Sequence, residues 1–410
     1  MVTISPFQAL RPEAQLAKSV ASRPYDVLNS KEAKVEAQGN PNSFLHITKS
    51  EIGLADTTDI HSQEVYDKAK ENLTAFISRN ILFRENKPCY YIYRLTMDGR
   101  SQAGLVCGSS VDDYENGLIK KHEFTRPEKE LDRINHIKTT GAQTGNVFLA
   151  YKNVADIDEV INGWMNEKNP QYDFVAEDSI QHSIWIVNDD ETIETITHLF
   201  KTKVPATYIA DGHHRAASAA KVRTALGENA TENADFFLTT LFPSNQLAIM
   251  DYNRVVKDLN DLSEADLIKK IEEKFTVEKV SEQYKPTAAH EFGLYINKQW
   301  YKLVANKGTF DASHPIEVLD VSILQNNLLD PVLGIKDQRT DKRIDFVGGI
   351  RGLGELEKRV DSGEMALAIS IYPVSIEQLF AVADSGEVMP PKSTWFEPKL
   401  RDGLLTHLID

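Results

Sequence analysis

Strand-like and helix-like segments follow one another along this chain without strict alternation, and this order restricts its fold more than any other feature. Residues 64–79 carry apolar side chains at helical spacing, whereas residues 89–95 and 102–107 show alternation and predict paired strands with Met97-Asp98-Gly99 in the turn. A doubly wound parallel sheet needs regular alternation of strand and helix. The sequence therefore predicts an α+β fold built on a mixed sheet.

The remaining elements are expected from the same patterns and from turn residues. Strands are expected at 147–151, 183–187, 206–210 and 365–373, and helices at 155–167, 190–202, 216–226, 263–275, 318–329, 353–361 and 375–384. Two more hairpins are expected, one joining 236–241 to 247–256 near Pro243-Ser244-Asn245 and one over 292–304 with Asn297-Lys298 in the turn. Residues 4–29 are expected to be extended, and residues 330–348 to form a polar loop.

Two domains are expected because a chain of 410 residues is too long for one compact core. Hydrophobic residues make up 41% of the chain, which is enough apolar material to offset the entropy lost on folding. The predicted division assigns residues 1–245 to a catalytic or nucleotide-binding domain. Residues 246–410 are assigned to a second α/β region that completes the site.

Net charge and cysteine content indicate which binding partners and which cellular compartment to expect for this protein. The 46 Lys and Arg residues stand against 61 Asp and Glu residues, and a net charge of -15 would repel a polyanion, so nucleic acid is not an expected partner. Cys89 and Cys107 lie in apolar runs, as is usual in a reducing compartment. With no signal-peptide pattern and no apolar stretch long enough to span a membrane, the protein is expected in the cytoplasm. The oligomeric state is left open.

The run Ala210-Asp211-Gly212-His213-His214-Arg215 is the first candidate site, because it falls where an apolar strand ends and a helix begins. Gly212 permits close approach of the backbone, and the helix start offers unpaired N–H groups and a positive dipole end. Arg215 supplies a bidentate fork for phosphate oxygens, and one of the histidines could act as acid or base near neutral pH. The pattern predicts a phosphate-handling turn. The alternative is that Asp211 only caps the helix while the histidines form structural hydrogen bonds.

The second candidate site is the charged run from Ile119 to Arg126, which leads into a helix. Thr125 as N-cap, Pro127 at the first position and Glu128 as partner of a capping box predict where that helix starts. Glu123 could take a proton from a hydroxyl group or hold a metal ion. Helical spacing aims Arg126, Glu130 and Arg133 the same way. The residues predicted to bind an acidic substrate are Lys120, Lys121, His122, Thr125, Arg126 and Arg133. A solvated charge run is the alternative.

A third candidate lies near the C-terminus, where prolines flank hydroxyl, basic and aromatic side chains between residues 390 and 399. Lys392, Ser393 and Thr394 are predicted to contact phosphate as this segment closes over a ligand. A structural connector is the alternative, since proline-rich connecting segments are common.

Metal-binding patterns are weak in this sequence. There is no pair of cysteines at zinc spacing and no His-Glu-x-x-His motif, and adjacent histidines cannot both face one ion from regular structure, so no protein-held metal is predicted. A magnesium ion carried with ADP or ATP needs only one or two carboxylates and is the compatible cofactor. Walker-type and Gly-x-Gly-x-x-Gly phosphate loops are also missing from the sequence.

The sequence resembles a known family, catalogued as domain of unknown function 1015, whose members look like distant relatives of the ParB/sulfiredoxin superfamily (SpoOJ/ParA/ParB/RepB-like proteins). The resemblance is carried, in this order, by Arg23-Pro24-Tyr25-Asp26-Val27, by the run from Ile119 to Arg126, by Ile209 to Arg215 and by Pro391-Lys392-Ser393-Thr394-Trp395-Phe396. It implies a ParB-like core in which the turn Asp211 to Arg215 binds nucleotide phosphates.

The resemblance also implies candidate activities, because the superfamily includes a nucleotide-dependent free-serine kinase, sulfiredoxins and chromosome-partition proteins. Some family members occur beside serine-biosynthesis genes, which implies a role in serine or phosphoserine metabolism. His213 stands where the sulfiredoxins have a reactive cysteine, so sulfinic-acid repair is not expected.

Two functions from different classes follow. The favoured one is a nucleotide-dependent phosphotransferase (kinase) or phosphatase acting on a small hydroxyl or phospho metabolite, with serine or phosphoserine favoured. In it, Gly212 and Arg215 hold phosphates, Glu123 is the base, and Asp211, His213 and His214 assist. The alternative is a ParB-like, nucleotide-gated DNA-binding or partition protein, and a plain structural scaffold remains a third possibility.

Overall fold

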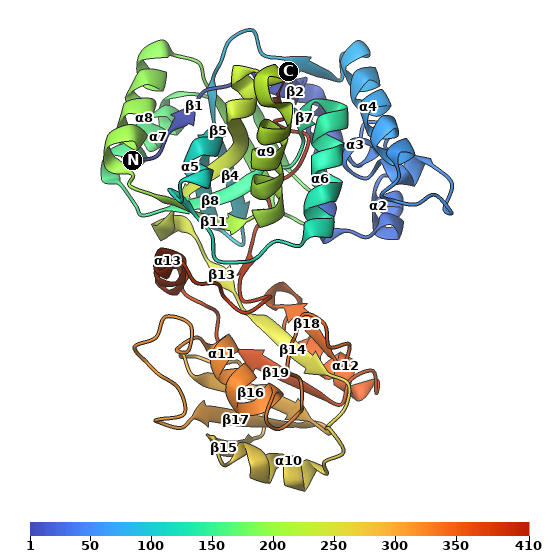
Figure 1. The fold of residues 1–410 in the computed structure, drawn as a ribbon, viewed down its shortest axis with the longest axis vertical. Helices are drawn as coiled ribbons and strands as arrows, with labels where there is room; N and C mark the ends of the chain where they lie inside the picture. The colour runs from blue at the N-terminus through green and yellow to red at the C-terminus, as the bar shows by residue number, and fades with distance from the viewer. Residues whose placement is uncertain (410) are drawn as a thin grey trace. The chain divides into compact units, whose positions relative to one another are not determined.

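The computed structural model describes residues 1–409, and it is organised by a nine-stranded mixed sheet and a six-stranded antiparallel sheet (Figure 1). These sheets and the helices packed on them form an α+β fold, which confirms the predicted fold class. Contacts divide the chain into two units. Unit 1 comprises Met1–Leu247 together with the chain from Pro398 onward, and unit 2 comprises Ala248–Glu397. The segment after Pro398 was assigned to the second region in the sequence-based division, but it packs within unit 1.

The large sheet of unit 1 has the strand order β6-β11-β8-β12-β5-β4-β10-β9, with β1 paired to β5. Only the β6/β11 and β8/β12 pairs of this sheet are parallel. Its strands are β1 (Ile4–Ser5), β4 (Tyr90–Met97), β5 (Arg100–Ser110), β6 (Ile119–Lys120), β8 (Val147–Tyr151), β9 (Tyr172–Val175), β10 (Gln181–Val187), β11 (Thr207–Asp211) and β12 (Phe236–Pro243). Two short ribbons pair β2 (Leu10–Pro12) with β3 (Leu82–Arg84), and β7 (Ala142–Gln143) with β21 (His407–Leu408).

Apolar helix faces cover the large sheet. Buried residues of α5, α7, α8 and α9 share one apolar cluster with side chains of the sheet, and α4 packs in a second cluster with β2 and β3. Figure 1 shows α9 and α6 side by side, and the two helices are in contact. The helices of unit 1 are α1 (Ala17–Val20), α2 (Ser30–Glu36), α3 (Leu45–Thr48), α4 (Gln63–Ser78), α5 (Val111–Glu115), α6 (Pro127–Thr140), α7 (Ala155–Glu167), α8 (Asp190–Lys203) and α9 (His213–Leu226).

Unit 2 is built on the antiparallel sheet β15-β17-β16-β19-β14-β18, with α12 packed against β19, β16 and β14. Its strands are β13 (Ile249–Met250), β14 (Tyr252–Val256), β15 (Phe275–Val280), β16 (Glu291–Ile296), β17 (Gln299–Ala305), β18 (Ile344–Gly348), β19 (Leu367–Ile371) and β20 (Trp395–Phe396). Its helices are α10 (Glu264–Ile271), α11 (Asp320–Leu324), α12 (Leu353–Asp361) and α13 (Ile376–Ser385), and α11 continues as a π-helical turn, Gln325–Leu329.

Two of the expected hairpins are confirmed. β4 pairs with β5 around Asp98 and Gly99, whose φ angles are 52° and 77°. β16 pairs with β17 around Asn297 and Lys298, whose φ angles are 46° and 63°. Positive φ at both central residues is the geometry of a tight two-residue turn whose twist matches that of the strands, and Asn, Asp and Gly adopt it most readily.

The third expected hairpin is wrong. β12 pairs with β5 and β8 in unit 1, whereas β14 pairs with β18 and β19 in unit 2. The chain therefore passes from one sheet to another near Pro243, where the sequence indicated a turn. Alternation of apolar and polar side chains predicts that a segment is a strand with one buried face, but it does not predict which other strand pairs with it. β18 is a second correction, because the polar loop expected at 330–348 ends in this strand.

Three other features bear on earlier expectations. The helix of residues 64–79 is α4, and its apolar stripe is buried, at Val65, Ala69, Leu73 and Phe76. Both cysteines are buried and unpaired. Within the part of the chain that the structure describes, no helix is both long and apolar enough to cross a membrane.

Candidate functional site

Two parallel strands bring the first two candidate runs together. β6 and β11 pair in parallel with Tyr208 opposite Lys120, so both strands end at the same edge of the sheet. The run after β6 begins at Lys121, and the run after β11 begins at Gly212. Ligand sites of α/β proteins commonly form at the carboxyl ends of parallel strands, where the following loops meet.

Gly212 makes the turn from β11 into α9. Its φ of 96° lies in the left-handed region that a residue with a side chain rarely adopts, and it is the N-cap of α9. Gly212 has no side chain that could cap this helix, and the Asp211 carboxylate pairs with Arg215 and Lys399 instead. The N–H groups of the first helical turn therefore remain available for another acceptor.

The segment from His122 to Arg126, which we call the arch, is hydrogen-bonded at both ends to the first turn of α9. The His122 N–H donates to His213 Nε2 at 3.4 Å, and the Arg126 N–H donates to His214 Nε2 at 3.0 Å. The rings of His122 and His213 also pack edge to face, with their centres 4.6 Å apart. The adjacent histidines thus act as two acceptors that hold one loop.

An acceptor nitrogen must be unprotonated, and the surroundings keep these rings neutral. Burial and the neighbouring His122 hold the pKa of His213 well below its ordinary value, and burial lowers the pKa of His122 to about 4. Burial and the charge of Arg126 lower the pKa of the half-buried His214. At neutral pH all three rings are therefore uncharged.

Charged and apolar side chains meet solvent along the arch. Glu123 has a side chain that is 44% exposed, and its Oε2 lies 4.0 Å from His213 Nδ1. Phe124 is 72% exposed. Lys120 is half-buried at the end of β6, and the Lys121 ammonium lies 3.8 Å from the centre of the Tyr114 ring, where burial lowers its pKa.

Arg215 lies behind the turn, buried and paired with two carboxylates. Its Nη2 donates to Asp26 Oδ2 at 3.0 Å and lies 3.5 Å from Asp211 Oδ2, while Nη1 donates to the Asn146 carbonyl. A Cβ added at Gly212 would come within 3.3 Å of the guanidinium carbon, so the glycine also makes room for this side chain. Arg215 therefore organises the turn from within, and its fork is occupied by protein acceptors.

Sequence reasoning missed two residues that complete this cluster. Lys399 Nζ lies 3.2 Å from Asp211 Oδ2, and Asp26 forms the other ion pair of Arg215. Burial alone would raise the pKa of Asp211, but the charges of Lys399 and Arg215 lower it well below its ordinary value. Asp26 stood in a motif that carried the family resemblance and could have been found there. Lys399 ended the third candidate segment, but it lies 188 residues from Asp211, and no local pattern paired the two residues.

The start of α6 differs from the prediction. Arg126 is the N-cap, with Pro127 in the first turn, and no side chain caps the helix, so the capping box of Thr125 and Glu128 is wrong. The Thr125 hydroxyl instead donates to the buried Glu130 carboxylate, which also pairs with Lys221. Thr125 therefore bonds to a side chain in α6 and not to the N–H groups at the start of that helix.

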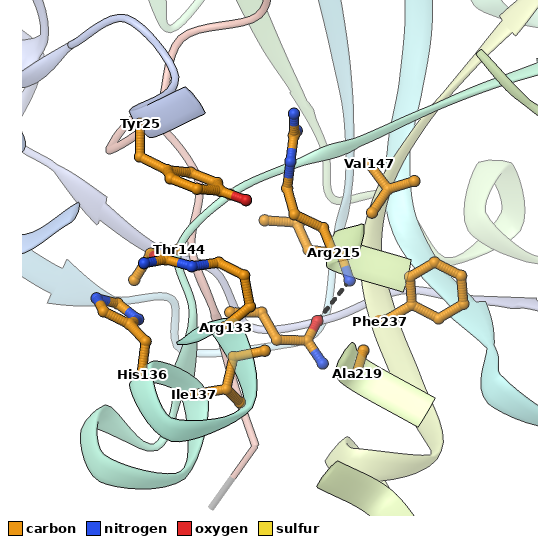
Figure 2. Close-up of a pocket in the computed structure, with 12 residues that line it drawn as sticks. Tyr25, Arg133, His136, Ile137, Thr144, Val147, Arg215, Ala219 and Phe237 are labelled. Atoms are coloured by element: carbon orange, nitrogen blue, oxygen red, sulfur yellow. Dashed lines mark hydrogen bonds between the residues drawn. The ribbon is translucent and has the colours of Figure 1, made fainter. Parts of the chain in front are cut away.

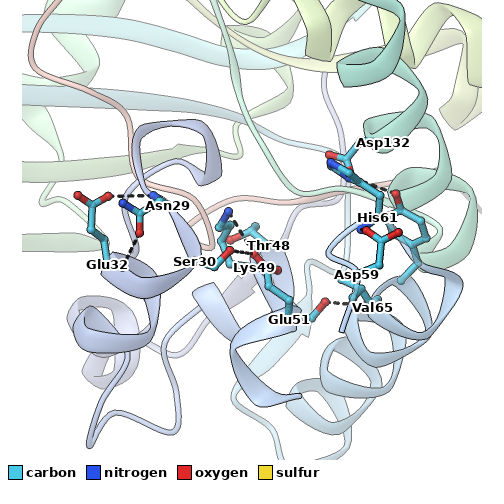
Figure 3. Close-up of polar contacts among 12 residues, drawn as sticks. Asn29, Ser30, Glu32, Thr48, Lys49, Glu51, Asp59, His61, Val65 and Asp132 are labelled. Atoms are coloured by element: carbon cyan, nitrogen blue, oxygen red, sulfur yellow. Dashed lines mark hydrogen bonds and ion pairs between the residues drawn. The ribbon is translucent and has the colours of Figure 1, made fainter. Parts of the chain in front are cut away.

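Arg133 points into the protein. Its Nε and Nη2 donate to Asp132 Oδ2 at 2.9 and 2.7 Å, and its guanidinium carbon lies 3.9 Å from the centre of the Tyr25 ring. Asp132 Oδ1 is also hydrogen-bonded to His61 Nδ1, at 3.0 Å (Figure 3). Because Arg133 is only 9% exposed, the structure does not bring it to the surface where the arch lies.

A small cavity of about 20 Å³ lies between Tyr25, Arg133 and Arg215 (Figure 2). This volume corresponds to about one water molecule, so it cannot hold a nucleotide or an amino acid. A nucleotide or an amino acid that binds near this turn would therefore lie outside this cavity.

Residues 390–397 of the third candidate segment belong to unit 2, whereas Pro398 and Lys399 belong to unit 1. Lys392 Nζ lies 5.6 Å from the centre of the Tyr252 ring, and Ser393 Oγ donates to the Pro390 carbonyl at 2.6 Å. Thr394 is half-buried beside them in the chain. These contacts lie within unit 2, so a phosphate-binding role for Lys392, Ser393 and Thr394 stays a prediction.

Within 1–409, no group of three or more His, Cys, Asp or Glu side chains is placed to hold a metal ion. Asp26 and Asp211, which share Arg215 Nη2, form a pair of partly exposed carboxylates. Two carboxylates suffice for magnesium that arrives on a nucleotide, since magnesium keeps several waters and phosphate oxygens as ligands.

Comparison with solved structures found distant similarities. A conserved hypothetical protein from Pyrococcus furiosus is 14% identical with a TM-score of 0.36, over 73% of this chain and 93% of that one. A free serine kinase in complex with AMP is 13% identical with a TM-score of 0.37, over 74% and 91% of the two chains. A C-terminally truncated SbnI from Staphylococcus aureus is 11% identical with a TM-score of 0.39, over 72% and 85%. TM-scores this low carry no argument about activity.

Comparison with protein families gave a clear assignment. No curated protein matched the sequence. The family described as protein of unknown function (DUF1015) matches residues 4–322, which includes the turn before α9, the arch and the motif with Asp26. Because this match covers most of the chain, the protein belongs to the DUF1015 family.

Proposed function

We propose that this protein is a nucleotide-dependent phosphotransferase or phosphatase that acts on a small hydroxyl or phospho metabolite. Serine and phosphoserine are the favoured substrates, because the sequence resemblance described above implies them. We include in the proposal a ParB/sulfiredoxin-like core within unit 1, with the turn from Asp211 to Arg215 as its phosphate-binding element.

One observation carries the proposal: the exposed Glu123 carboxylate is held beside the uncapped start of α9. Glu123 Oε2 lies 4.0 Å from His213 Nδ1, and α9 begins at that histidine with no side-chain cap. A helix start supplies N–H donors and a positive dipole end for phosphate oxygens. A carboxylate next to a bound phosphate is placed to accept the proton of an attacking hydroxyl group.

The residues divide the work of phosphoryl transfer, which requires positioning and charge neutralisation more than covalent catalysis. The start of α9 after Gly212 holds the phosphates. The hydroxyl oxygen bonds to the transferred phosphorus while the bond to the bridging oxygen of the nucleotide breaks, and Glu123 takes the hydroxyl proton. Lys120, Lys121 and Arg126 neutralise an acidic substrate.

Arg215 takes a positioning role in this proposal. Its guanidinium holds Asp26 and Asp211, and a direct contact with phosphate would require one of these carboxylates to move away. Asp26 and Asp211 would hold a nucleotide-borne magnesium ion, which would add positive charge opposite the phosphates. The pairing of Arg215 and Lys399 with carboxylates reduces the positive charge that these two residues could offer to DNA, which favours the phosphotransferase over the DNA-binding alternative.

The proposal predicts that Glu123→Gln removes the base without disturbing the fold. Turnover should fall by roughly 10²- to 10⁴-fold, the usual contribution of a general base. The assay is phosphate transfer or release with serine, phosphoserine, ADP and ATP, with and without magnesium. Glu128→Gln is the matched control, because Glu128 is an exposed acid five residues away at the start of α6. Equal turnover in both variants would refute the role of Glu123, and no turnover by the wild type under any condition would refute the proposed function.

A further inference from the structure

Phe124 is an exception among the aromatic residues of this protein. The sequence has 17 Phe, 14 Tyr and 4 Trp residues, and Phe124 is the only one of them that is exposed in the described structure, at 72%. Burying a phenylalanine stabilises a fold by about 1.5–3 kcal/mol relative to leaving it in water. Packing therefore does not explain an aromatic ring at this position.

The position of Phe124 is fixed by the arch that carries it. His122 and Arg126, two residues away on either side, are hydrogen-bonded to His213 and His214 in the first turn of α9. A chain of four peptide units tied at both ends cannot carry its middle residue far from that turn. Phe124 is therefore held near the helix start that the proposed function assigns to phosphate.

The neighbours of Phe124 indicate what kind of group it contacts. Glu123 and Arg126 are charged and exposed, and Thr125 is half-buried and polar, so the ring is not part of a continuous apolar patch within the arch. A protein partner usually covers a contiguous patch with an apolar centre. A nucleotide base needs only one ring face, because its edges are polar, and base–aromatic stacking is a recurrent mode of recognition.

We propose that Phe124 stacks on the base of the nucleotide whose phosphates bind at the start of α9, and that it determines the preference for a nucleotide over inorganic phosphates. This inference rests on the proposed function. It adds a contact to the base, which Glu123 and the start of α9 do not provide.

The test compares ADP with inorganic pyrophosphate, which has the phosphates and no base, by isothermal titration of the full-length protein. Phe124→Ala should weaken ADP binding by roughly 5- to 100-fold, as expected for the loss of one stacking contact, and leave pyrophosphate binding unchanged. Leu131→Ala is the matched control, because Leu131 is a 58%-exposed apolar residue on α6, and it should change neither affinity. Phe124→Trp should retain ADP affinity and show a fluorescence change with ADP but not with pyrophosphate.

Each other outcome overturns the inference in a distinguishable way. Unchanged ADP affinity in Phe124→Ala would show that the ring makes no contact with the base, while the proposed function would stand. Equal weakening of ADP and pyrophosphate would show that the substitution acts through the arch. Failure of the wild-type protein to bind either ligand would overturn both this inference and the proposed function.

Discussion

Arg215 shows how strongly a single residue depends on its surroundings. In sequence it is an arginine behind a glycine turn, as expected of a phosphate ligand, yet in the structure it is 8% exposed and bound to Asp26, Asp211 and a carbonyl. Removing a buried partner of this kind leaves uncompensated charges and commonly destabilises a protein strongly. Arg215→Ala would therefore report on stability as well as on catalysis, and Glu123→Gln is the sharper variant for activity.

Gly212 is the residue whose conformation the site requires most directly. We expect Gly212→Ala to lower the free energy of unfolding by about 1–2 kcal/mol, because a side chain is disfavoured in the left-handed region. Its φ is 96°, and the added Cβ would lie 3.3 Å from the guanidinium carbon of Arg215. Chemical denaturation measures the change.

The control for this variant is Gly163→Ala. Gly163 lies inside α7, and a Cβ there would meet no atom within 4 Å, so the alanine should leave stability unchanged or raise it by up to about 1 kcal/mol through helix propensity. If both alanine variants were equally stable, the left-handed turn would not be a source of strain.

At the scale of secondary-structure elements, the arch and α9 behave as one element. Neither forms the site alone, since the backbone of the arch donates to the two histidines and the histidines belong to the helix. This arrangement gives the adjacent histidines a structural role that uses their neutral acceptor nitrogens. It also links the position of Glu123 to the first turn of α9.

We expect His214→Ala to loosen the arch, because the Arg126 N–H loses its acceptor at 3.0 Å. Trypsin should then cleave faster after Lys120 and Lys121, the basic residues that lead into the arch, than it does in the wild type. Limited proteolysis followed by mass spectrometry measures this rate.

His214→Gln provides the comparison, because its amide oxygen can replace the ring nitrogen as acceptor. Cleavage in this variant should stay closer to the wild-type rate. Cleavage of His214→Ala at the wild-type rate would mean that the hydrogen bond does not hold the arch in solution.

Buried histidines are spread through the whole of unit 1, and together they set its response to acid. Burial is the first cause in each case. The pKa falls to about 4 at His122 and His136, to about 3 at His182, and below the ordinary value at His213, His214 and His407. The unfolded chain binds protons at these positions below about pH 6.5, while the folded chain does not until the pH is lower. Their contribution to stability is therefore complete above pH 6.5 and is lost as the pH falls.

Two buried carboxyl groups act in the opposite direction. Burial raises the pKa of Asp402 in unit 1 and of Asp320 in unit 2 to about 7, so the folded protein holds these protons where the unfolded chain releases them. The stability that these two groups contribute to the folded protein is complete below the ordinary carboxyl pKa and is lost as the pH rises through 7. Between pH 6.5 and 4 these groups, together with the buried Asp113, whose pKa burial also raises, offset part of the destabilising effect of the histidines.

We therefore expect the protein to unfold more easily at pH 5 than at pH 7. The histidines outnumber the buried carboxyl groups with raised pKa values, so the net effect of acid should be destabilising. Differential scanning calorimetry at the two pH values gives the apparent Tm, and an equal or higher Tm at pH 5 would contradict the expected balance of buried groups.

Much of the local structure could be predicted from the sequence, because it depends on neighbouring residues. The stripe of α4, the tight turns at Asp98-Gly99 and Asn297-Lys298, and the strand–turn–helix around Gly212 all follow from side-chain spacing or from the freedom of one or two backbone angles. The kinds of side chain in the candidate site could be predicted for the same reason, because each of its two runs is continuous in the sequence.

Only the tertiary structure decided which of these pieces meet. β12 and β14 joined different sheets although a hairpin was expected, and the chain after Pro398 returned to unit 1, where Lys399 pairs with Asp211. Arg215 met Asp26, which lies 189 residues away. Side-chain alternation and charge predict whether a segment lies in an apolar or a polar environment. Many different segments could provide that environment, so the actual partner depends on the packing of the whole chain.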